Sequence, residues 1–161
     1  MTRFEVTYAE QACFVCGQKN QDGFRVSFIL DGDDGIYFNV KIPEMYQGYD
    51  GIVHGGMIST MLDEVMANCF FRRGIDCVTI EINVRFLKAL PVEKDVKVVG
   101  KIEKQNSRFG FSTGWIEDNT GTRYAEGNGK FYLIAEDSDE VIIRKSFLEN
   151  NESNNKNQEY K

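Results

Sequence analysis

The residues best suited to chemistry begin with His54, the only histidine of the 161-residue chain. It stands directly before Gly55 and Gly56, and Asp63 follows nine positions after the histidine. Glycines at the start of a helix would offer bare backbone N–H groups at the positive end of the helix dipole. Such donors suit a developing oxyanion, and glycine lets a substrate approach the backbone closely. A carboxylate further along the same helix could act as a general base or a nucleophile.

The helix expected behind the glycines carries large apolar residues at the spacing of one broad buried stripe. They are Met57, Ile58, Met61, Leu62, Val65, Met66, Cys69 and Phe70. At about 100° per residue, Asp63 lies outside this stripe, beside the small residues Thr60 and Ala67. The carboxylate could therefore face a second surface. Gly74 is the expected end of the helix.

Each of these residues also has a purely structural interpretation. A lone histidine before a helix is more often a structural hydrogen-bonding residue than a catalytic one. Gly55 and Gly56 could form an ordinary turn. Asp63 and Glu64 could be solvated helix surface, since the helical projection keeps both of them off the apolar stripe. Periodicity alone does not choose between these interpretations.

Segments with strand character surround the helix. Aromatic and β-branched residues fill 24–30 and 35–42, with a hairpin turn over 31–35 between them. After the helix, the strand-like segments are 78–87, 95–105, 109–117 and 124–135, and 118–121 forms the last turn.

The 78–87 segment has the clearest alternation in the chain. Its apolar residues are Ile80, Ile82, Val84 and Phe86, and the residues between them are Thr79, Glu81, Asn83 and Arg85. This pattern predicts a strand with one face in the core and one polar face. Thr79 could also be no more than a polar strand residue, because threonine favours strands.

The predicted order is β-β-α-β-β-β-β, which indicates an α+β domain with one long central helix wrapped by an antiparallel sheet. We expect this domain to span 1–137. The remainder, 138–161, is acidic and then Asn-rich, and we expect it to be a disordered tail unless 141–148 adds a short element.

Composition excludes several classes of function. The net charge of −6 and the pI of about 4.9 argue against a nucleic-acid partner. No apolar run approaches the ~20 residues of a membrane span, and 1–10 lacks the apolar stretch of a signal peptide. The cytoplasm is therefore the expected location.

The four cysteines, Cys13, Cys16, Cys69 and Cys77, are expected to be reduced, because a domain of this size needs no disulfides. Cys13-Phe-Val-Cys16 is half of a zinc-knuckle pattern, but no second CxxC or nearby histidine completes four ligands. A folded turn without metal is the favoured interpretation. A metal shared between two chains stays open as the alternative.

The segment HGGMISTMLDEVM, with Asp63 nine residues after His54, resembles the signature of PaaI-like acyl-CoA thioesterases, which have the hot-dog fold. Three further segments are similar to that family: a Cys-x-x-Cys-Gly-x-x-Asn-x-x-Gly segment at Cys13–Gly23, a loop at Gln47–Gly51 and a strand at Thr79–Pro91. Together they cover about 13–134.

The resemblance implies a role for each residue of the motif. Gly56 would donate to the oxyanion, and Asp63 would be the general base or the attacking carboxylate. Gln47 would contact the thioester or the water, where many relatives have asparagine. His54 would orient the loop and line the site, and Thr79 would assist Asp63.

The resemblance also implies where substrate and subunits bind. Gly55, Asn83, Arg85 and Arg108 are the expected substrate-binding residues, and the two arginines would contact the nucleotide end of coenzyme A, since guanidinium suits phosphate. The site of the family lies between two subunits, so we expect a homodimer that shares its active sites. A tetramer is a further possibility.

The expected function is hydrolysis of a small or medium acyl or aryl thioester of coenzyme A. No metal and no cofactor are expected beyond the coenzyme A of the substrate. The alternative is a hot-dog protein that binds acyl-CoA as a sensor or carrier without turnover. A hot-dog dehydratase fits the spacing of His54 and Asp63 poorly.

Overall fold

The computed structural model describes residues 5–134 of the chain. The strands are β1 (Glu5–Val6), β2 (Phe28–Asp31), β3 (Gly35–Lys41), β4 (Cys77–Phe86), β5 (Asp95–Gln105), β6 (Phe109–Glu117) and β7 (Arg123–Leu133), and the helices are the 3-10 turn η1 (Glu44–Tyr46) and α1 (Gly55–Phe71). The predicted order is confirmed, with β1 as a short additional strand. The expectations for 138–161 and for 141–148 lie outside the described residues.

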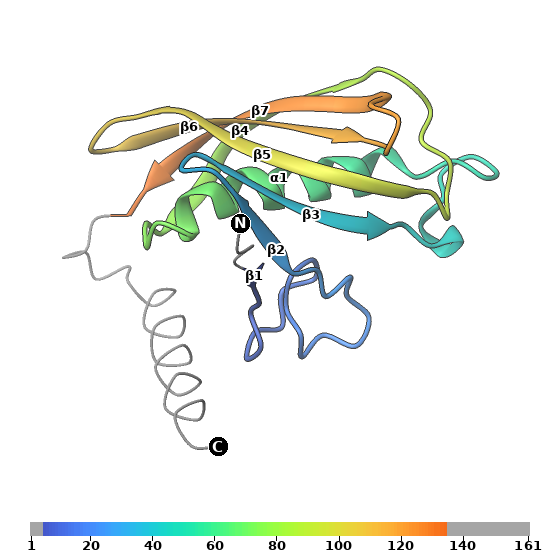
Figure 1. Ribbon diagram of the computed structural model, residues 1–161, viewed down its shortest axis with the longest axis horizontal. Coiled ribbons are helices and arrows are strands. Elements are labelled where there is room, and N and C mark those ends of the chain that lie inside the picture. The colour runs from blue at the N-terminus through green and yellow to red at the C-terminus, as the bar shows by residue number, and fades with distance from the viewer. Residues whose placement is uncertain (1–4, 135–161) are drawn as a thin grey trace.

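The strands form a single antiparallel sheet in the order β1-β2-β3-β5-β6-β7-β4. Figure 1 shows this sheet curved over α1, which runs beneath the longer strands. The chain enters α1 after β3 and leaves it into β4, which is the last strand at one edge. The predicted α+β fold with one long helix wrapped by an antiparallel sheet is therefore confirmed.

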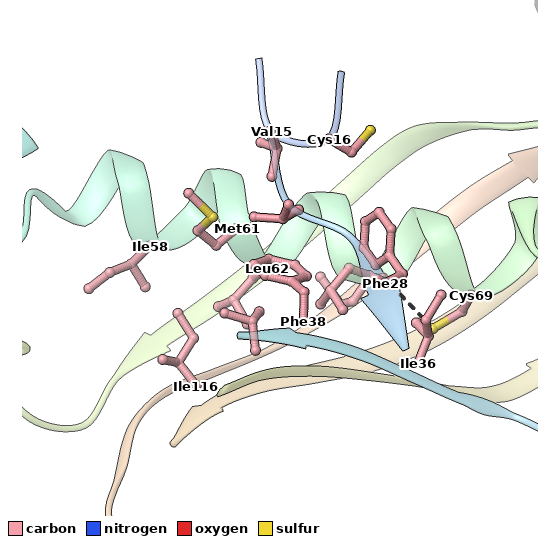
Figure 2. Close-up of a cluster of buried hydrophobic side chains, with 14 of the residues drawn as sticks. Val15, Cys16, Phe28, Ile36, Phe38, Ile58, Met61, Leu62, Cys69 and Ile116 are labelled. Atoms are coloured by element: carbon pink, nitrogen blue, oxygen red, sulfur yellow. Dashed lines mark hydrogen bonds between the residues drawn. The ribbon is translucent and has the colours of Figure 1, made fainter. Parts of the chain in front are cut away.

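The apolar stripe of α1 lies against the sheet as predicted. Its buried residues include Met61, Leu62, Val65, Met66 and Phe70, each fully enclosed. Figure 2 shows Leu62 between the helix and the strand residues Phe38 and Ile116. β5 approaches the helix so closely at Gly100 that a Cβ there would lie 2.7 Å from the Val65 carbonyl oxygen. A buried, closely packed helix of this kind is a rigid support for the residues at its first turns.

The strand expected at 24–30 is mostly absent, since β2 covers only Phe28–Asp31. The backbone N–H groups of Phe24 and Val26 donate instead to the carbonyls of Phe14 and Val15, at 2.9 Å and 3.0 Å. Arg25 has a positive φ of 50°, which interrupts an extended run. This segment therefore pairs with the N-terminal loop rather than with the sheet.

The prediction that one face of the 78–87 strand is core is wrong for its two ends. Ile80 and Phe86 are 51% and 57% exposed in the single chain. Only Ile82 and Val84 are partly buried. The reason is that β4 is an edge strand, with β7 as its only neighbour among the described strands. Its outer edge carries unpaired backbone groups.

The predicted polar face of β4 is also divided. The pairing with β7 shifts register between Thr79 and Glu81, so one extra residue is inserted into the strand. Such a bulge exchanges inward and outward side chains beyond it. Thr79 consequently meets α1, whereas Asn83 and Arg85 lie on the opposite face of the sheet. The expectation that these three residues share one face is wrong.

Candidate active site

His54 caps the N-terminus of α1. Its Nδ1 accepts a hydrogen bond from the N–H of Gly56 at 2.9 Å, and its carbonyl accepts from the N–H of Met57 at 2.9 Å. Because Nδ1 accepts, the neutral imidazole carries its proton on Nε2. The N–H that the resemblance assigns to an oxyanion is thus bonded to the imidazole in this structure, and a substrate oxygen would have to replace that bond. The N–H of Gly55 has no acceptor among the described residues.

The loop before α1 is closed by Gln47. Its side-chain Oε1 accepts from the N–H of Gly51 at 2.9 Å, and its backbone pairs with Val53. Gly51 has a φ of 72°, which favours glycine at this position. Since Oε1 is used within the loop, the amide NH₂ of Gln47 is the part of the side chain that can donate to a ligand. Gly48 lies directly beneath the His54 ring and leaves space for it.

A pocket of about 630 Å³ opens beside this helix terminus. Its walls are largely apolar and include Ile58, Phe86 and Leu90, while His54 and Gly55 line one side. Apolar walls with a few convergent polar groups are the usual form of a small-molecule site. A second hollow, of about 640 Å³, lies over 21–29 and 39–46 and contains none of the predicted site residues.

Thr79 and Asp63 are in direct contact. The hydroxyl of Thr79 donates to Oδ1 of Asp63 at 2.8 Å, from β4 to the exposed side of α1. The β4 bulge makes this contact possible, because it turns Thr79 toward the helix. The structure therefore brings this predicted pair together, while its catalytic role stays a prediction.

The predicted catalytic residues form two groups rather than one. Gln47, His54, Gly55 and Gly56 gather at the start of α1, whereas Asp63 is seven residues further along the helix. Seven residues correspond to about 10 Å along a helix axis. Reacting atoms must approach to about 3–3.5 Å. Gly56 and Asp63 of one chain are therefore too far apart to touch the same carbonyl group directly.

The predicted substrate-binding residues of the sheet are separated as well. Arg85 forms an ion pair with Glu126 at 2.8 Å, and Asn83 donates to Glu81 at 2.8 Å, both on the face away from α1. Arg108 is exposed in the β5–β6 turn, and its side chain has no partner in the described part of the chain. Arg85 pairs with Glu126 of β7, which pairs in turn with Trp115 of β6. Trp115 is seven residues from Arg108, which is about 23 Å at ~3.3 Å per residue. The two arginines do not converge within one chain.

One polar cluster was missed from the sequence. Glu64 does not lie on the solvated surface, so that interpretation is wrong for this half of the Asp63–Glu64 pair. Its two carboxylate oxygens lie 3.6 Å and 3.8 Å from Sγ of Cys13. Burial raises the pKa of Glu64 to about 7, and a hydrogen bond from the Cys16 thiol lowers the pKa of Cys13 to about 5. The only local signal was Asn68 four residues after Glu64, which donates to Glu64 Oε1 at 3.0 Å.

In the part of the chain that the structure describes, neither α1 nor η1 has the length and apolar character that a bilayer-spanning helix needs. The four cysteines are free thiols.

Comparison with known proteins shows what part of the chain is similar to. The profile of the thioesterase superfamily matches residues 50–125, which contain the start of α1, Asp63 and β4. Acyl-coenzyme A thioesterase 13 of Mus musculus is 23% identical over 112 residues, which cover 68% of this chain and 80% of that protein.

Two solved structures identify the fold. A thioesterase superfamily protein superposes with a TM-score of 0.70 at 24% identity, over 74% of this chain and 62% of that one. A hypothetical thioesterase from Streptococcus pneumoniae, solved with coenzyme A, superposes with a TM-score of 0.65 at 18% identity, over 70% of this chain and 88% of that one. The helix and its curved sheet thus form a hot-dog fold.

Proposed function

The profile of the thioesterase superfamily matches residues 50–125, and from this likeness we propose that the chain hydrolyses acyl-CoA thioesters to a free acid and coenzyme A. The observation that carries the proposal is the hydrogen bond from Thr79 to Asp63 on the exposed side of the central helix. Its homologues include acyl-coenzyme A thioesterases, which are hydrolases. The pocket beside the helix terminus lies within the 300–1,000 Å³ range typical of ligand sites.

In this proposal Asp63 removes a proton from the attacking water, or attacks the thioester carbon itself. The Thr79 hydroxyl holds the carboxylate in one orientation. As the carbonyl oxygen gains negative charge, it takes the N–H of Gly56 from the His54 imidazole, at the positive end of the α1 dipole. Gln47 would donate its amide NH₂ to the thioester or the water. The carbon–sulfur bond then breaks, and the coenzyme A thiolate leaves and takes up a proton from Asp63 or from solvent. If Asp63 is the nucleophile, water then hydrolyses the anhydride between the acyl group and Asp63 and releases the free acid.

We further propose that the active site is shared between two chains in a homodimer. The spacing of Gly56 and Asp63 within one chain, about 10 Å along the helix axis, supports this, because one carbonyl needs both groups close by. The free edge of β4, with exposed Val78, Ile80 and Phe86, is suited to antiparallel pairing with a second β4. A two-fold axis through the middle of that pair would bring the helix start of one chain toward Asp63 of the other. Two such dimers could form a tetramer.

Substrate binding follows from the same arrangement. The backbone N–H of Leu133 donates to the carbonyl of Arg108, and Leu133 pairs with Cys77, the first residue of β4. Arg108 therefore lies at the same end of the sheet as the start of β4. Arg85 lies near the other end of that strand. Antiparallel pairing would therefore bring Arg108 of one chain to the end where the other chain carries Arg85, and both could contact coenzyme A phosphates. Asn83 lies beside Arg85, and Gly55 would line the acyl end of the site.

The pocket size favours a small or medium acyl group, or an aryl group. We expect the reaction to take place in the cytoplasm, because free thiols are usual in a reducing compartment.

A second function, acyl-CoA binding without turnover, is favoured by one observation. The N–H of Gly56 is bonded to His54, so the chain as it stands does not present that donor to a ligand. A protein that keeps this bond when a ligand is bound would be a sensor or carrier.

Hydrolysis of a panel of short, medium, long and aryl acyl-CoAs separates the two functions, with release of the free thiol as the signal. We expect turnover by the wild type, a loss of at least about a hundredfold in Asp63→Ala and Asp63→Asn, and unchanged turnover in Glu103→Gln. Glu103 is an exposed residue of β5. Tight acyl-CoA binding with no turnover by any form would favour the sensor and refute the hydrolase.

A further inference from the structure

Two thiols and a carboxylate meet on the side of α1 away from the sheet. The ligand atoms of Cys13, Cys16 and Glu64 all lie within 4.8 Å of one another. Figure 2 shows the segment with Val15 and Cys16 on the opposite side of α1 from Ile116 of the sheet. The cluster is therefore distinct from the pocket at the start of the helix, and its inference does not rest on the proposed function.

The distance between Cys13 and Glu64 matches tetrahedral coordination. Zinc binds thiolate sulfur at about 2.3 Å and carboxylate oxygen at about 2.0–2.2 Å, so two such ligands at a tetrahedral angle are about 3.6 Å apart. The nearer oxygen of Glu64 lies 3.6 Å from Sγ of Cys13. A metal could thus enter the cluster without a large movement of these two ligands.

The turn that carries the cysteines is built to direct its sulfurs inward. The N–H of Val15 donates to Sγ of Cys13 at 3.4 Å, and the N–H of Gly17 donates to the Cys13 carbonyl at 3.0 Å. An N–H directed at sulfur stabilises the thiolate, which is the form that binds metal. A Cβ at position 17 would collide with the backbone of Cys13, so only glycine allows the turn to fold this tightly.

The carboxylate is held by a second layer of hydrogen bonds. Asn68 donates to Oε1 of Glu64 at 3.0 Å, and the hydroxyl of Tyr8 donates to Oδ1 of Asn68 at 2.7 Å. Metal-binding carboxylates are commonly oriented by such partners. Over residues 5–134, Glu64 forms no ion pair with a lysine, arginine or histidine. An enclosed carboxylate without a cation is costly, and a metal ion would supply the missing charge.

We propose that Cys13, Cys16 and Glu64 bind a zinc ion, with a water molecule as the fourth ligand. Thiolate ligands favour zinc over magnesium or calcium, which prefer oxygen. On binding, the ion replaces the protons of the two thiols, which are released to solvent. The ion joins the N-terminal turn to α1 at the residue next to Asp63, so its role is to fix that turn on the helix.

The test uses the full chain, expressed without a histidine tag and purified under reducing conditions without chelator. We expect about one zinc ion per chain by elemental analysis. The chain stripped of metal should bind Co²⁺ with a sulfur-to-cobalt charge-transfer band and the visible absorption of a tetrahedral site. Removing the metal should lower the melting temperature, and added Zn²⁺ should restore it.

Variants assign the ligands. Cys13→Ser and Cys16→Ser should lose the charge-transfer band, and Glu64→Gln should weaken Co²⁺ binding at least about tenfold. Cys77→Ser is the matched control, because Cys77 is a buried thiol whose Sγ contacts the Ala67 carbonyl, outside the cluster. It should keep the band. The cobalt spectrum of the wild type tests the site without any variant. A variant that fails to fold therefore does not prevent the test.

Three results would overturn the proposal. The first is reduced wild type with less than about a tenth of a zinc ion per chain and no cobalt–sulfur band. The second is a band that survives in both Cys13→Ser and Cys16→Ser. The third is a purified chain in which these cysteines form a disulfide and, after reduction, still bind no metal.

Discussion

Replacement of Thr79 by valine tests whether its hydroxyl positions Asp63 for catalysis. Valine keeps the shape of threonine but removes the donor of the 2.8 Å hydrogen bond to Oδ1 of Asp63. A hydrogen bond to a charged group contributes about 1.5–3 kcal/mol, and each 1.36 kcal/mol corresponds to a factor of ten in rate. We therefore expect kcat to fall about ten- to a hundredfold. KM should change little, because the hydroxyl contacts the carboxylate rather than the substrate.

The assay is steady-state hydrolysis of the best acyl-CoA, followed by a colorimetric thiol reagent. Thr79→Ser keeps a hydroxyl and should recover most of the lost kcat. Thr7→Val is the matched control, because it removes a hydroxyl bond of similar length, 2.9 Å to Ser27, that involves neither Asp63 nor Thr79. The reasoning is refuted if Thr79→Val stays within about twofold of the wild type, or if Thr79→Ser is as impaired as Thr79→Val.

Three further predictions concern stability and assembly. Gly100→Ala should lower the free energy of unfolding by about 1–3 kcal/mol, because its Cβ would lie 2.7 Å from the Val65 carbonyl; urea denaturation measures this, and an unchanged midpoint would contradict it. Hydrogen bonds, led by that from Thr120, hold the pKa of Asp118 below its ordinary value. This carboxylate therefore stabilises the fold above its unfolded pKa of about 3.9, and the stabilisation is lost as pH falls further. The difference in melting temperature between wild type and Asp118→Ala should be largest at neutral pH and should disappear in strong acid. Ile80→Lys should convert the proposed dimer to monomers in analytical ultracentrifugation and abolish turnover; an active monomer would refute the shared site.

Much of the fold could be predicted because the patterns concerned are local. In α1, apolar residues recur about once per helical turn, and this spacing correctly predicts that Met61, Leu62 and Val65 are buried. The turn at Asp118 follows from its Asx hydrogen bonds to the next residues. Such features are decided within a few residues, so a single sequence contains them.

The errors come from contacts between distant segments. Phe24 and Val26 have strand composition, but their donors pair with a loop ten or more residues earlier in the chain. Glu64 looks solvated on a helical projection, and only the fold brings the cysteine turn over it. The bulge in β4 leaves no mark in an alternating sequence, since an extra residue is visible only against the partner strand. The motif was enough to name candidate site residues. It was not enough to predict on which face of the sheet Asn83 and Arg85 lie.

The bulge reverses the alternation of side chains between the two faces of β4. Before it, odd-numbered residues such as Cys77 and Thr79 face α1; after it, even-numbered residues such as Val84 do. A chain that lost one residue at this point would keep a ladder of nearly the same length, yet the hydroxyl of Thr79 would turn outward and Asp63 would be left with water. The count of backbone residues, rather than the identity of any side chain, thus determines whether the carboxylate has a donor.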